Sequence, residues 1–447
     1  MNKLNKIIEY GLYALVFLLP WQTKLILRQG MLNRGPWEYG TIALYGTDIL
    51  LIGLLIVFAV QYFFYSEAKP RDDKKNRGIV IILSGLDLFI FISTFFAPDT
   101  VLAIYRYVLF LLGLGLFWLV LKTEFSRKKM AIAFFSGLFI QSCLAIWQFL
   151  NQGTFAFKWL GLAAHSPGDL GVSVIETAGA DGVGERWLRA YGSLDSPNIL
   201  GGLLAIGLII IFWIIINDQR IARKKTDAKF IFYILSLIIF AVGLIFSFSR
   251  SAWLGFAVGI VIFLAAGLFK KDQLKLKKIG GVILLLAVLS GLIFINYQNL
   301  FITRAQGTAR LEVKSFSERK MYLSDSFNLI KKNWLFGSGI GNYTKTLAVK
   351  EPQRPWYYLQ PVHNTFLLVW AETGIFGLLF FIALLGFLFL QSVKKKNILS
   401  LSILSILAII MIFDHYLWSL HFGILFFWII IGFIYKNLIN VYGESKN

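Results

Sequence analysis

The chain has 447 residues, and 57% of them are hydrophobic, a composition too apolar for a soluble domain of this size. Its formal charge of +20 at pH 7 does not indicate nucleic-acid binding, because the lysines and arginines collect in short links between apolar runs. The single cysteine, Cys143, excludes an intrachain disulfide.

Twelve apolar runs follow one another along the chain, each near the roughly 20 residues that a helix needs to cross a bilayer. They predict an all-α polytopic membrane protein in which residues 1–447 form a single integral membrane domain. No small-residue cleavage site follows the first run, so we expect a retained span rather than a signal peptide. The expected spans are 7–27, 46–65, 79–97, 101–121, 129–150, 197–216, 229–247, 251–269, 279–296, 362–390, 398–414 and 419–438. The last two could instead form one re-entrant unit.

The links between these runs alternate in charge. Short links after even-numbered spans are rich in Lys and Arg, as in NDQRIARKKTDAK (217–229), whereas APDT (97–100) has none and FSRS (248–251) has one. Positively charged links remain in the cytoplasm, which predicts that both termini are cytoplasmic. The long links 151–196 and 297–361 are then expected to be extracytoplasmic, since long loops cross the membrane regardless of their charge.

The second long link contains a segment whose apolar residues fall on one helical face, namely Phe316, Leu323, Phe327, Ile330 and Trp334. We expect an amphipathic helix here that lies on the outer membrane surface or caps the bundle. The three glycines of GSGIGNY (337–343) favour a hinge over a phosphate-binding backbone nest. The three aromatic residues of RPWYYLQP (354–361) favour an interfacial belt over a sugar-stacking platform.

Three distant segments place a cation or a base at the expected outer membrane level. Arg189 precedes the sixth span, whose start is marked by Ser196 as a helix cap and Pro197 in the first turn. Arg250 lies in the tight turn between the seventh and eighth spans, and His363 lies at the start of the tenth. Each also has a structural interpretation, because such side chains can snorkel to lipid headgroups, form salt bridges or hydrogen-bond at the interface.

Other ionisable residues near these positions are candidates too. Glu372 is nine residues beyond His363, about 13 Å along a helix axis, so the two cannot touch within one helix. A buried structural role and a functional role for Glu372 remain equally open. Asp414 and His415, at the outer end of the eleventh span, could form a second acid–base pair. The four histidines are scattered and no metal-ligand or nucleotide-binding pattern appears, so we expect no metal and no cofactor.

In order along the chain, FSFSRSAWLGF, ERKMYLSDSFNLIKKNWLFGSGIGNY and HNTFLLVWAETGIFG resemble the O-antigen ligase and O-antigen polymerase family of bacterial membrane glycosyltransferases. YGTDILLIGLL (45–55) and YGSLDSPNILGG (191–202) are similar to further stretches of that family. The resemblance implies a location in the bacterial cytoplasmic (inner) membrane and a reaction at its outer face. The donor would be a glycan on polyprenyl diphosphate, and the acceptor a hydroxyl of a glycan, glycolipid or protein. It also implies metal-free inversion, and it does not separate ligases from polymerases.

The resemblance also assigns residues by position. The catalytic candidates are two arginines that face the diphosphate and one essential histidine, that is Arg189, Arg250 and His363. The substrate-binding candidates are Arg186, which is an alternative match to Arg189, and Arg319, Asn364 and Glu372.

The chemistry of these residue types agrees with that assignment. Breaking a sugar–diphosphate bond develops negative charge on the leaving group, which soluble enzymes often neutralise with Mg²⁺. Arginine suits this task without a metal, because it is permanently charged and donates to phosphate in a bidentate manner. Histidine suits the role of general base toward the acceptor hydroxyl.

Two other functions compete with this hypothesis. A transporter or flippase of lipid-linked glycans would place charge around a cavity at the membrane midplane, whereas nearly all charge here lies at the span ends. A non-catalytic scaffold would not need arginines and a histidine at one membrane level. Membrane lipids are expected partners in every case.

Overall fold

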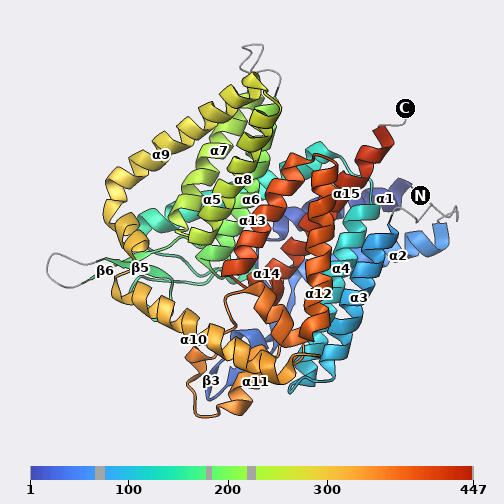
Figure 1. The fold of residues 1–447 in the computed structure, drawn as a ribbon, viewed down its shortest axis with the longest axis vertical. Helices are drawn as coiled ribbons and strands as arrows, with labels where there is room; N and C mark the ends of the chain where they lie inside the picture. Colours follow the sequence, from blue (N-terminus) through green and yellow to red (C-terminus); the bar gives the residue numbers. More distant parts are fainter. Residues whose placement is uncertain (1, 66–75, 178–183, 219–227, 445–447) are drawn as a thin grey trace.

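The computed structural model describes most of the chain, over residues 2–65, 76–177, 184–218 and 228–444 (Figure 1). Each expected span corresponds to a helix: α1 (Asn2–Leu18), α2 (Gly46–Tyr65), α3 (Arg77–Thr94), α4 (Thr100–Lys122), α5 (Arg127–Asn151), α6 (Pro197–Asn217), α7 (Ala228–Phe246), α8 (Arg250–Phe269), α9 (Gln273–Gln306), α12 (Thr365–Lys394), α13 (Ile398–Phe413) and α15 (His421–Glu444). The basic link 217–229 lies mostly outside the described residues.

The predicted all-α polytopic class is confirmed. Among the described residues, nine helices are long and apolar enough to cross a membrane, and two more, at 230–246 and 398–413, are apolar but shorter. The number of helices that cross the bilayer, and the side on which each loop lies, remain predictions from the sequence.

Two helices, α6 and α15, are the most deeply buried of the long apolar helices. The sequence of α6, PNILGGLLAIGLIIIFWIIIN, is apolar on all sides, as expected for a helix that protein surrounds. It packs against α7, α8 and α13, while α15 packs against α4. By contrast, α9 slopes away from the bundle toward α10 (Arg310–Asn333), which runs across one end of the other helices (Figure 1).

The first predicted span, 7–27, is wrong at its C-terminal end. Helix α1 stops at Leu18, and Pro20 follows at once, which cannot continue a helix without losing a hydrogen bond. Strand β1 (Lys24–Arg28) then pairs antiparallel with β4 (Ile42–Tyr45), and the short strands β2 (Met31–Leu32) and β3 (Gly35–Pro36) pair between them. Residues 19–45 therefore form a third sizeable segment outside the long helices, between α1 and α2, in addition to the two long links.

The first long link, 151–196, contains an antiparallel ribbon of β5 (Val174–Thr177) and β6 (Glu185–Leu188). The second begins later than expected, because α9 continues to Gln306 through a kink at Tyr297. It then contains α10, α11 (Tyr343–Lys350) and a single turn at Trp356–Tyr358.

Helix α10 is the amphipathic helix expected in the second link. Of the five residues predicted to share its apolar face, Ile330 is buried, while Phe316, Leu323, Phe327 and Trp334 are exposed. The side that packs on the rest of the protein includes Tyr322, Ser326 and Leu329. An exposed apolar stripe favours the first alternative for this helix, which is contact with the membrane surface.

Helix α12 is broken at Gly374, whose φ of 74° and ψ of −177° lie in a region open almost only to glycine. The break lets backbone groups of α12 pair with the glycine-rich segment 337–343. The N–H groups of Ser338 and Gly339 donate to the carbonyls of Ala371 and Glu372. These donors are therefore engaged within the protein, which favours a structural role for this segment over a phosphate-binding nest.

Replacing Gly374 with alanine should destabilise the protein by at least about 1–3 kcal/mol, because the backbone would be strained. A Cβ atom at this position would also lie 2.0 Å from the carbonyl oxygen of Leu335. The thermal midpoint in detergent measures the effect. Gly386→Ala is the matched control, since that site in the same helix has open space and ordinary φ; equal midpoints for the two variants would contradict the prediction.

Candidate active site

The tight turn between α7 and α8 binds two arginines through its carbonyl groups. Phe248, with a φ of 46°, adopts a left-handed conformation that is unusual for a bulky residue. The carbonyl of Ser247 accepts a hydrogen bond from Nε of Arg189 at 2.9 Å. The carbonyl of Phe248 accepts one from Nη2 of Arg304, also at 2.9 Å. The turn thus joins the first long link to the end of α9.

Arg250, the first residue of α8, belongs to the same cluster. Its Nη2 lies 3.1 Å from Oε2 of Glu312, and its Nη1 donates to the carbonyl of Arg304 at 2.9 Å. Glu312 is buried and also forms an ion pair with Arg304. A buried carboxylate between two guanidinium groups holds both in position.

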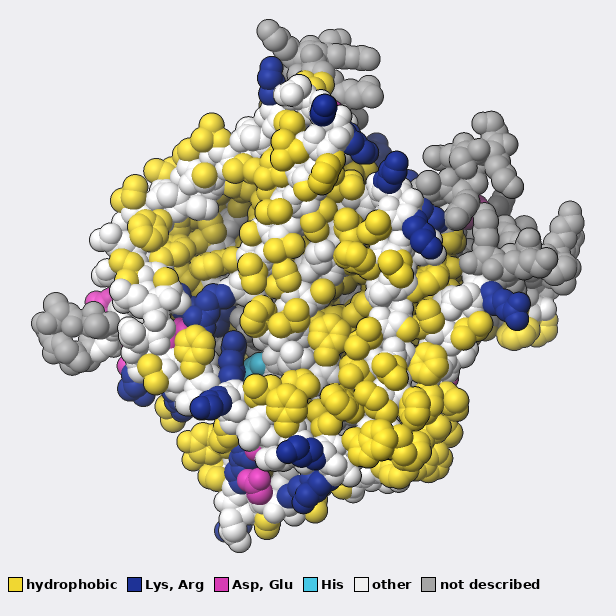
Figure 2. Space-filling view, in the orientation of Figure 1, with side chains coloured by type: hydrophobic (Ala, Val, Ile, Leu, Met, Phe, Trp, Pro, Cys, Tyr) yellow, Lys and Arg dark blue, Asp and Glu magenta, His cyan; other side chains and the backbone are white. Residues whose placement is uncertain are grey.

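Arg189 and Arg319 complete a group of four arginines. Arg189 interacts electrostatically with Arg304, Glu312 and Arg250, and Arg319 interacts with Asp414, Arg250 and Glu312. Four guanidinium groups against the two carboxylates leave an excess of two positive charges among these six described residues, which favours binding of an anion. Burial and the charge of Arg304 lower the pKa of Arg189 to about 9, so it remains charged at pH 7. Figure 2 shows Lys or Arg side chains beside a histidine in a hollow next to α10.

A chain of polar contacts links the arginine cluster to His363. Nη2 of Arg189 donates to Oδ1 of Asn198 at 2.7 Å, and Nδ2 of Asn198 donates to Oδ2 of Asp414 at 2.9 Å. Oδ1 of Asp414 lies 3.9 Å from Nδ1 of His363. Residues from the first long link, the start of α6, the end of α13 and the start of α12 therefore meet in one place. The three predicted catalytic residues are all part of this site or linked to it.

Asp414 and His415 lie in the loop after α13 and differ in charge. Burial disfavours the ionised form of Asp414, but its interactions with His363 and His415 and with the N–H of His415 outweigh burial and lower its pKa. Burial and the proximity of His363 lower the pKa of His415 to about 3, so its ring is neutral at pH 7. Nδ1 of His415 lies 2.7 Å from Oγ of Ser419. Of the two, Asp414 is the charged partner of His363.

The histidines are scattered along the sequence, but the fold brings one pair of them together with a carboxylate. Within the described part of the chain, the ligand atoms of His363, Asp414 and His415 lie within 4.8 Å of one another, a spacing that a metal ion could bridge. In this structure Asp414 accepts hydrogen bonds from Asn198 and from the N–H of His415. The sequence analysis expected His363 and the pair of Asp414 and His415 at the outer ends of spans, but it did not predict that they meet, since 51 residues separate His363 from Asp414.

Two of the predicted substrate-binding residues have structural contacts instead. Arg186, in β6, donates to the carbonyls of Gly168 and Asp169. Asn364 caps α12, because its Oδ1 accepts from the N–H of Leu367, and its Nδ2 donates to the carbonyl of Ile412. These contacts fold the loop and fix the helix start. They provide no reason to assign either residue to substrate.

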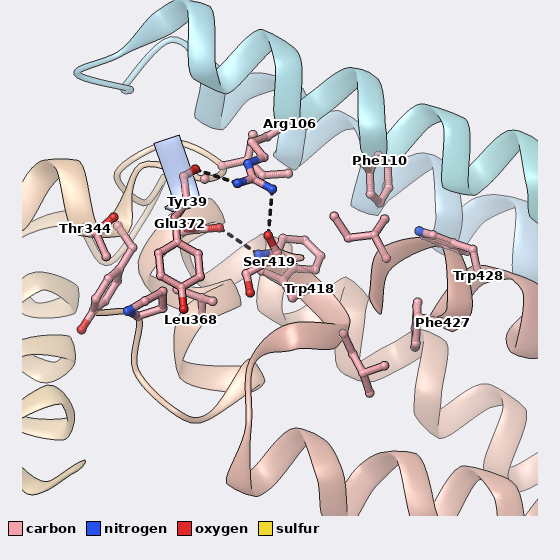
Figure 3. A pocket seen from close by; sticks show the side chains of 16 residues that line it. Tyr39, Arg106, Phe110, Thr344, Leu368, Glu372, Trp418, Ser419, Phe427 and Trp428 are labelled. Carbon is pink, nitrogen blue, oxygen red and sulfur yellow. Dashed lines mark hydrogen bonds between the residues drawn. The ribbon is translucent and has the colours of Figure 1, made fainter. Parts of the chain in front are cut away.

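Glu372 faces a separate, small cavity of ≈ 30 Å³, shown in Figure 3. Its Oε2 accepts a hydrogen bond from Nε1 of Trp418 at 2.8 Å. Arg106 of α4 also lines this cavity and donates to the carbonyls of Tyr39 and Ser419 (Figure 3). The cavity has room for water but not for a sugar. The position of Glu372 therefore supports the buried structural role.

Several members of this site were not anticipated from the sequence. Arg304 and Glu312 lie in a stretch rich in charge, FITRAQGTARLE, and nothing there distinguishes them from other solvated residues. Asn198 lies within YGSLDSPNILGG, one of the stretches similar to the ligase and polymerase family, so a signal was present for it.

Replacing Asp414 with asparagine should lower activity at pH 7 by roughly 10- to 10³-fold, because His363 loses the anion that orients and stabilises its protonated ring. Because the pKa of Asp414 is lowered in the folded protein, its carboxylate keeps its charge as the pH falls through the ordinary range of an aspartate. It is therefore ionised at pH 7, where product formed per minute by the purified protein measures the loss. Unchanged activity in the variant would contradict this role. The control is Asp325→Asn, which removes the ion pair between Asp325 of α10 and Arg354 of the following loop.

Comparison with known proteins agrees with the resemblance in the sequence motifs. Residues 234–382 match the model of a family described as O-antigen ligase. The matched segment contains Arg250, Arg319 and His363, and Arg189 precedes it. No curated protein matches the chain. The resemblance to the O-antigen ligase family is therefore confirmed over residues 234–382, the part of the chain that holds most of the arginine cluster and the candidate histidine.

Proposed function

We propose that the protein is a metal-independent, inverting glycosyltransferase of the O-antigen ligase or polymerase type. It transfers a glycan from polyprenyl diphosphate to a hydroxyl group of a glycan, glycolipid or protein acceptor. The observation that carries the proposal is the cluster of four arginines linked through Asn198 and Asp414 to His363. A fixed group of cations beside an acid–base pair is what transfer from a diphosphate without a metal requires.

The four arginines bind the diphosphate of the donor. As the bond between the anomeric carbon and the phosphate oxygen breaks, negative charge grows on the leaving diphosphate, and the guanidinium groups stabilise it. Arg250 and Arg189 are the donors we expect to contact the phosphates. Glu312 neutralises part of the cluster when no donor is bound, and this keeps the buried arginines in place.

His363 acts on the acceptor. Its neutral ring takes the proton of the acceptor hydroxyl while the oxygen attacks the anomeric carbon, and Asp414 stabilises the imidazolium that forms. Attack from the face opposite the diphosphate inverts the configuration at that carbon. The proton then leaves His363 to solvent or to the released diphosphate.

The membrane location is part of the proposal. The concentration of Lys and Arg in the even-numbered links supports cytoplasmic termini. The loops that carry the site then lie at the outer face of the bacterial cytoplasmic membrane. Flipped, lipid-linked donor would reach the site from the outer leaflet.

Transport of a lipid-linked glycan is the alternative function. The charged residues of the site come from helix ends and loops at one end of the bundle, which does not favour a charged pathway through its middle. Purified protein mixed with a polyprenyl-diphosphate-linked glycan and an acceptor distinguishes the two. A covalent product with inverted configuration supports the enzyme, whereas movement of donor across vesicles without product supports the transporter.

Chelation tests the metal-free part of the proposal. Transfer by the purified protein should be unchanged, within about twofold, after treatment with EDTA, because the arginines supply the charge that Mg²⁺ supplies in other enzymes. The spacing of His363, Asp414 and His415 makes the measurement necessary. Loss of product that only an added divalent ion restores would contradict the proposal.

A further inference from the structure

A cavity of ≈ 430 Å³ lies among α1, α5, α6, α13 and α15, away from the candidate active site. Aliphatic and aromatic side chains form most of its walls, including Leu19, Met130, Phe134, Ile210, Phe426 and Phe433. Protein interiors rarely contain voids much larger than a water molecule. A cavity of this size and polarity is therefore expected to be filled by an apolar chain when the protein is in a membrane.

The charged residues that line this cavity all lie at one of its ends. They are Glu124 and Arg127, around the start of α5, and Lys436, near the end of α15. Arg127 is exposed, while Nζ of Lys436 donates to the carbonyl of Val120 at 3.0 Å and lies 4.1 Å from the ring centroid of Phe125. The result is an apolar cavity with a mainly basic mouth.

This mouth is at the opposite end of the bundle from the arginine cluster. Arg127 begins α5, and Gln148 near the other end of that helix accepts a hydrogen bond from the N–H of Tyr191, in the loop that carries Arg189. The helical rise places Arg127 and Gln148 about 32 Å apart. Along α15, Phe422 and Lys436 both line the cavity and are separated by about 21 Å, which is more than half of the roughly 30 Å hydrocarbon core.

We propose that the cavity binds one acyl chain of an anionic phospholipid from the leaflet on the side of Arg127 and Lys436. The phosphate group lies at the basic mouth, where arginine and lysine favour it, and the chain occupies the apolar length. The donor proposed above has its diphosphate at the other end of the bundle, so its headgroup is not the one expected here. The site is independent of the proposed reaction.

Native mass spectrometry of the full-length protein in detergent, with phosphatidylglycerol as the probe and phosphatidylcholine for comparison, tests the headgroup. We expect one phosphatidylglycerol to be retained more tightly than phosphatidylcholine. Arg127→Gln should weaken phosphatidylglycerol binding by about fivefold, the usual effect of one basic residue. Lys128→Gln is the matched control, because Lys128 is exposed, adjacent and not part of the cavity wall. Equal binding of the two lipids, or equal losses in the two variants, would overturn the proposal.

Filling the cavity tests the chain-binding part. Ala131→Trp should reduce lipid retention at least tenfold, whereas Ile132→Trp, at a neighbouring position that is 56% exposed and outside the cavity, should not. If Ala131→Trp fails to give a single species in size-exclusion chromatography, the smaller change Ala131→Leu decides. Unchanged retention in the filled variant would overturn the proposal. A polyprenyl phosphate could also be retained more strongly than phosphatidylglycerol, and lose this retention when Ala131 is replaced. That result would overturn the proposal too, since the occupant would then be a different lipid.

Discussion

Replacing His363 with alanine should lower glycan transfer by roughly 10²–10⁴-fold while leaving the protein folded in the membrane. The ring is the group beside Asp414 that can take a proton from the acceptor, and alanine cannot replace it. Its side chain is partly exposed, so its loss should leave the core packing intact. Product formed per minute from a lipid-linked donor, at equal amounts of purified protein, measures the effect.

The matched control for this change is His165→Ala. His165 lies in the first long link against the ring of Tyr191, outside the contacts that join the arginines to His363. It should retain most activity. Full activity in His363→Ala would remove the general base from the mechanism, whereas loss of activity in both variants would point to a defect in folding.

Replacing Arg250 with alanine should lower transfer by roughly 10²–10³-fold, the usual effect of removing one donor to a developing negative charge. Arg250 is held by Glu312 and by the carbonyl of Arg304, so its guanidinium group is fixed before the donor binds. Arg250→Lys keeps the charge but loses the bidentate geometry and should recover only part of the activity. Steady-state measurements with donor and acceptor varied separately assign the loss to binding or to the chemical step.

Arg310→Ala is the matched control for Arg250. Arg310 is the first residue of α10 and also forms an ion pair, with Glu176, but its side chain is 70% exposed and the pair is expected to contribute little. Transfer should therefore stay within about twofold of the unchanged protein. A similar loss of activity for Arg250→Ala and Arg310→Ala would contradict the prediction. It would mean that the arginines contribute only general positive surface charge and do not stabilise the leaving group directly.

Much of the fold was predictable from the sequence, because the bilayer imposes a simple rule on apolar runs. Each of the twelve expected spans has a helix, and the caps at Ser196 and Pro197 are as predicted. The errors concern the C-terminal ends of two predicted spans. The length of the apolar runs did not show that α1 ends early, before Pro20, or that α9 continues past its kink at Tyr297. Both errors concern residues at the ends of apolar runs, where hydropathy changes gradually.

The candidate site was predictable only in part. The expected topology predicted one membrane level for Arg189, Arg250 and His363, and the resemblance to the O-antigen ligase family implied their roles. The partners that fix them did not follow from either source. Glu312, which lies in the second long link, forms an ion pair with Arg250 at the start of α8. Asn198 joins Arg189 to Asp414 through two hydrogen bonds. Such contacts depend on how loops cross the helix ends, which local sequence does not encode.

By itself, the sequence determined the class of the protein and its helices, and it predicted the membrane level of the catalytic candidates, because hydrophobicity, chain length and charge bias act locally along the chain. The tertiary structure decided which of those candidates act together. It gathered four arginines around Glu312, placed Asp414 beside His363 and left Glu372 in a separate small cavity. The physical reason is that pairing of charges depends on distances of a few ångströms between segments far apart in sequence, and only the packing of the helices sets those distances.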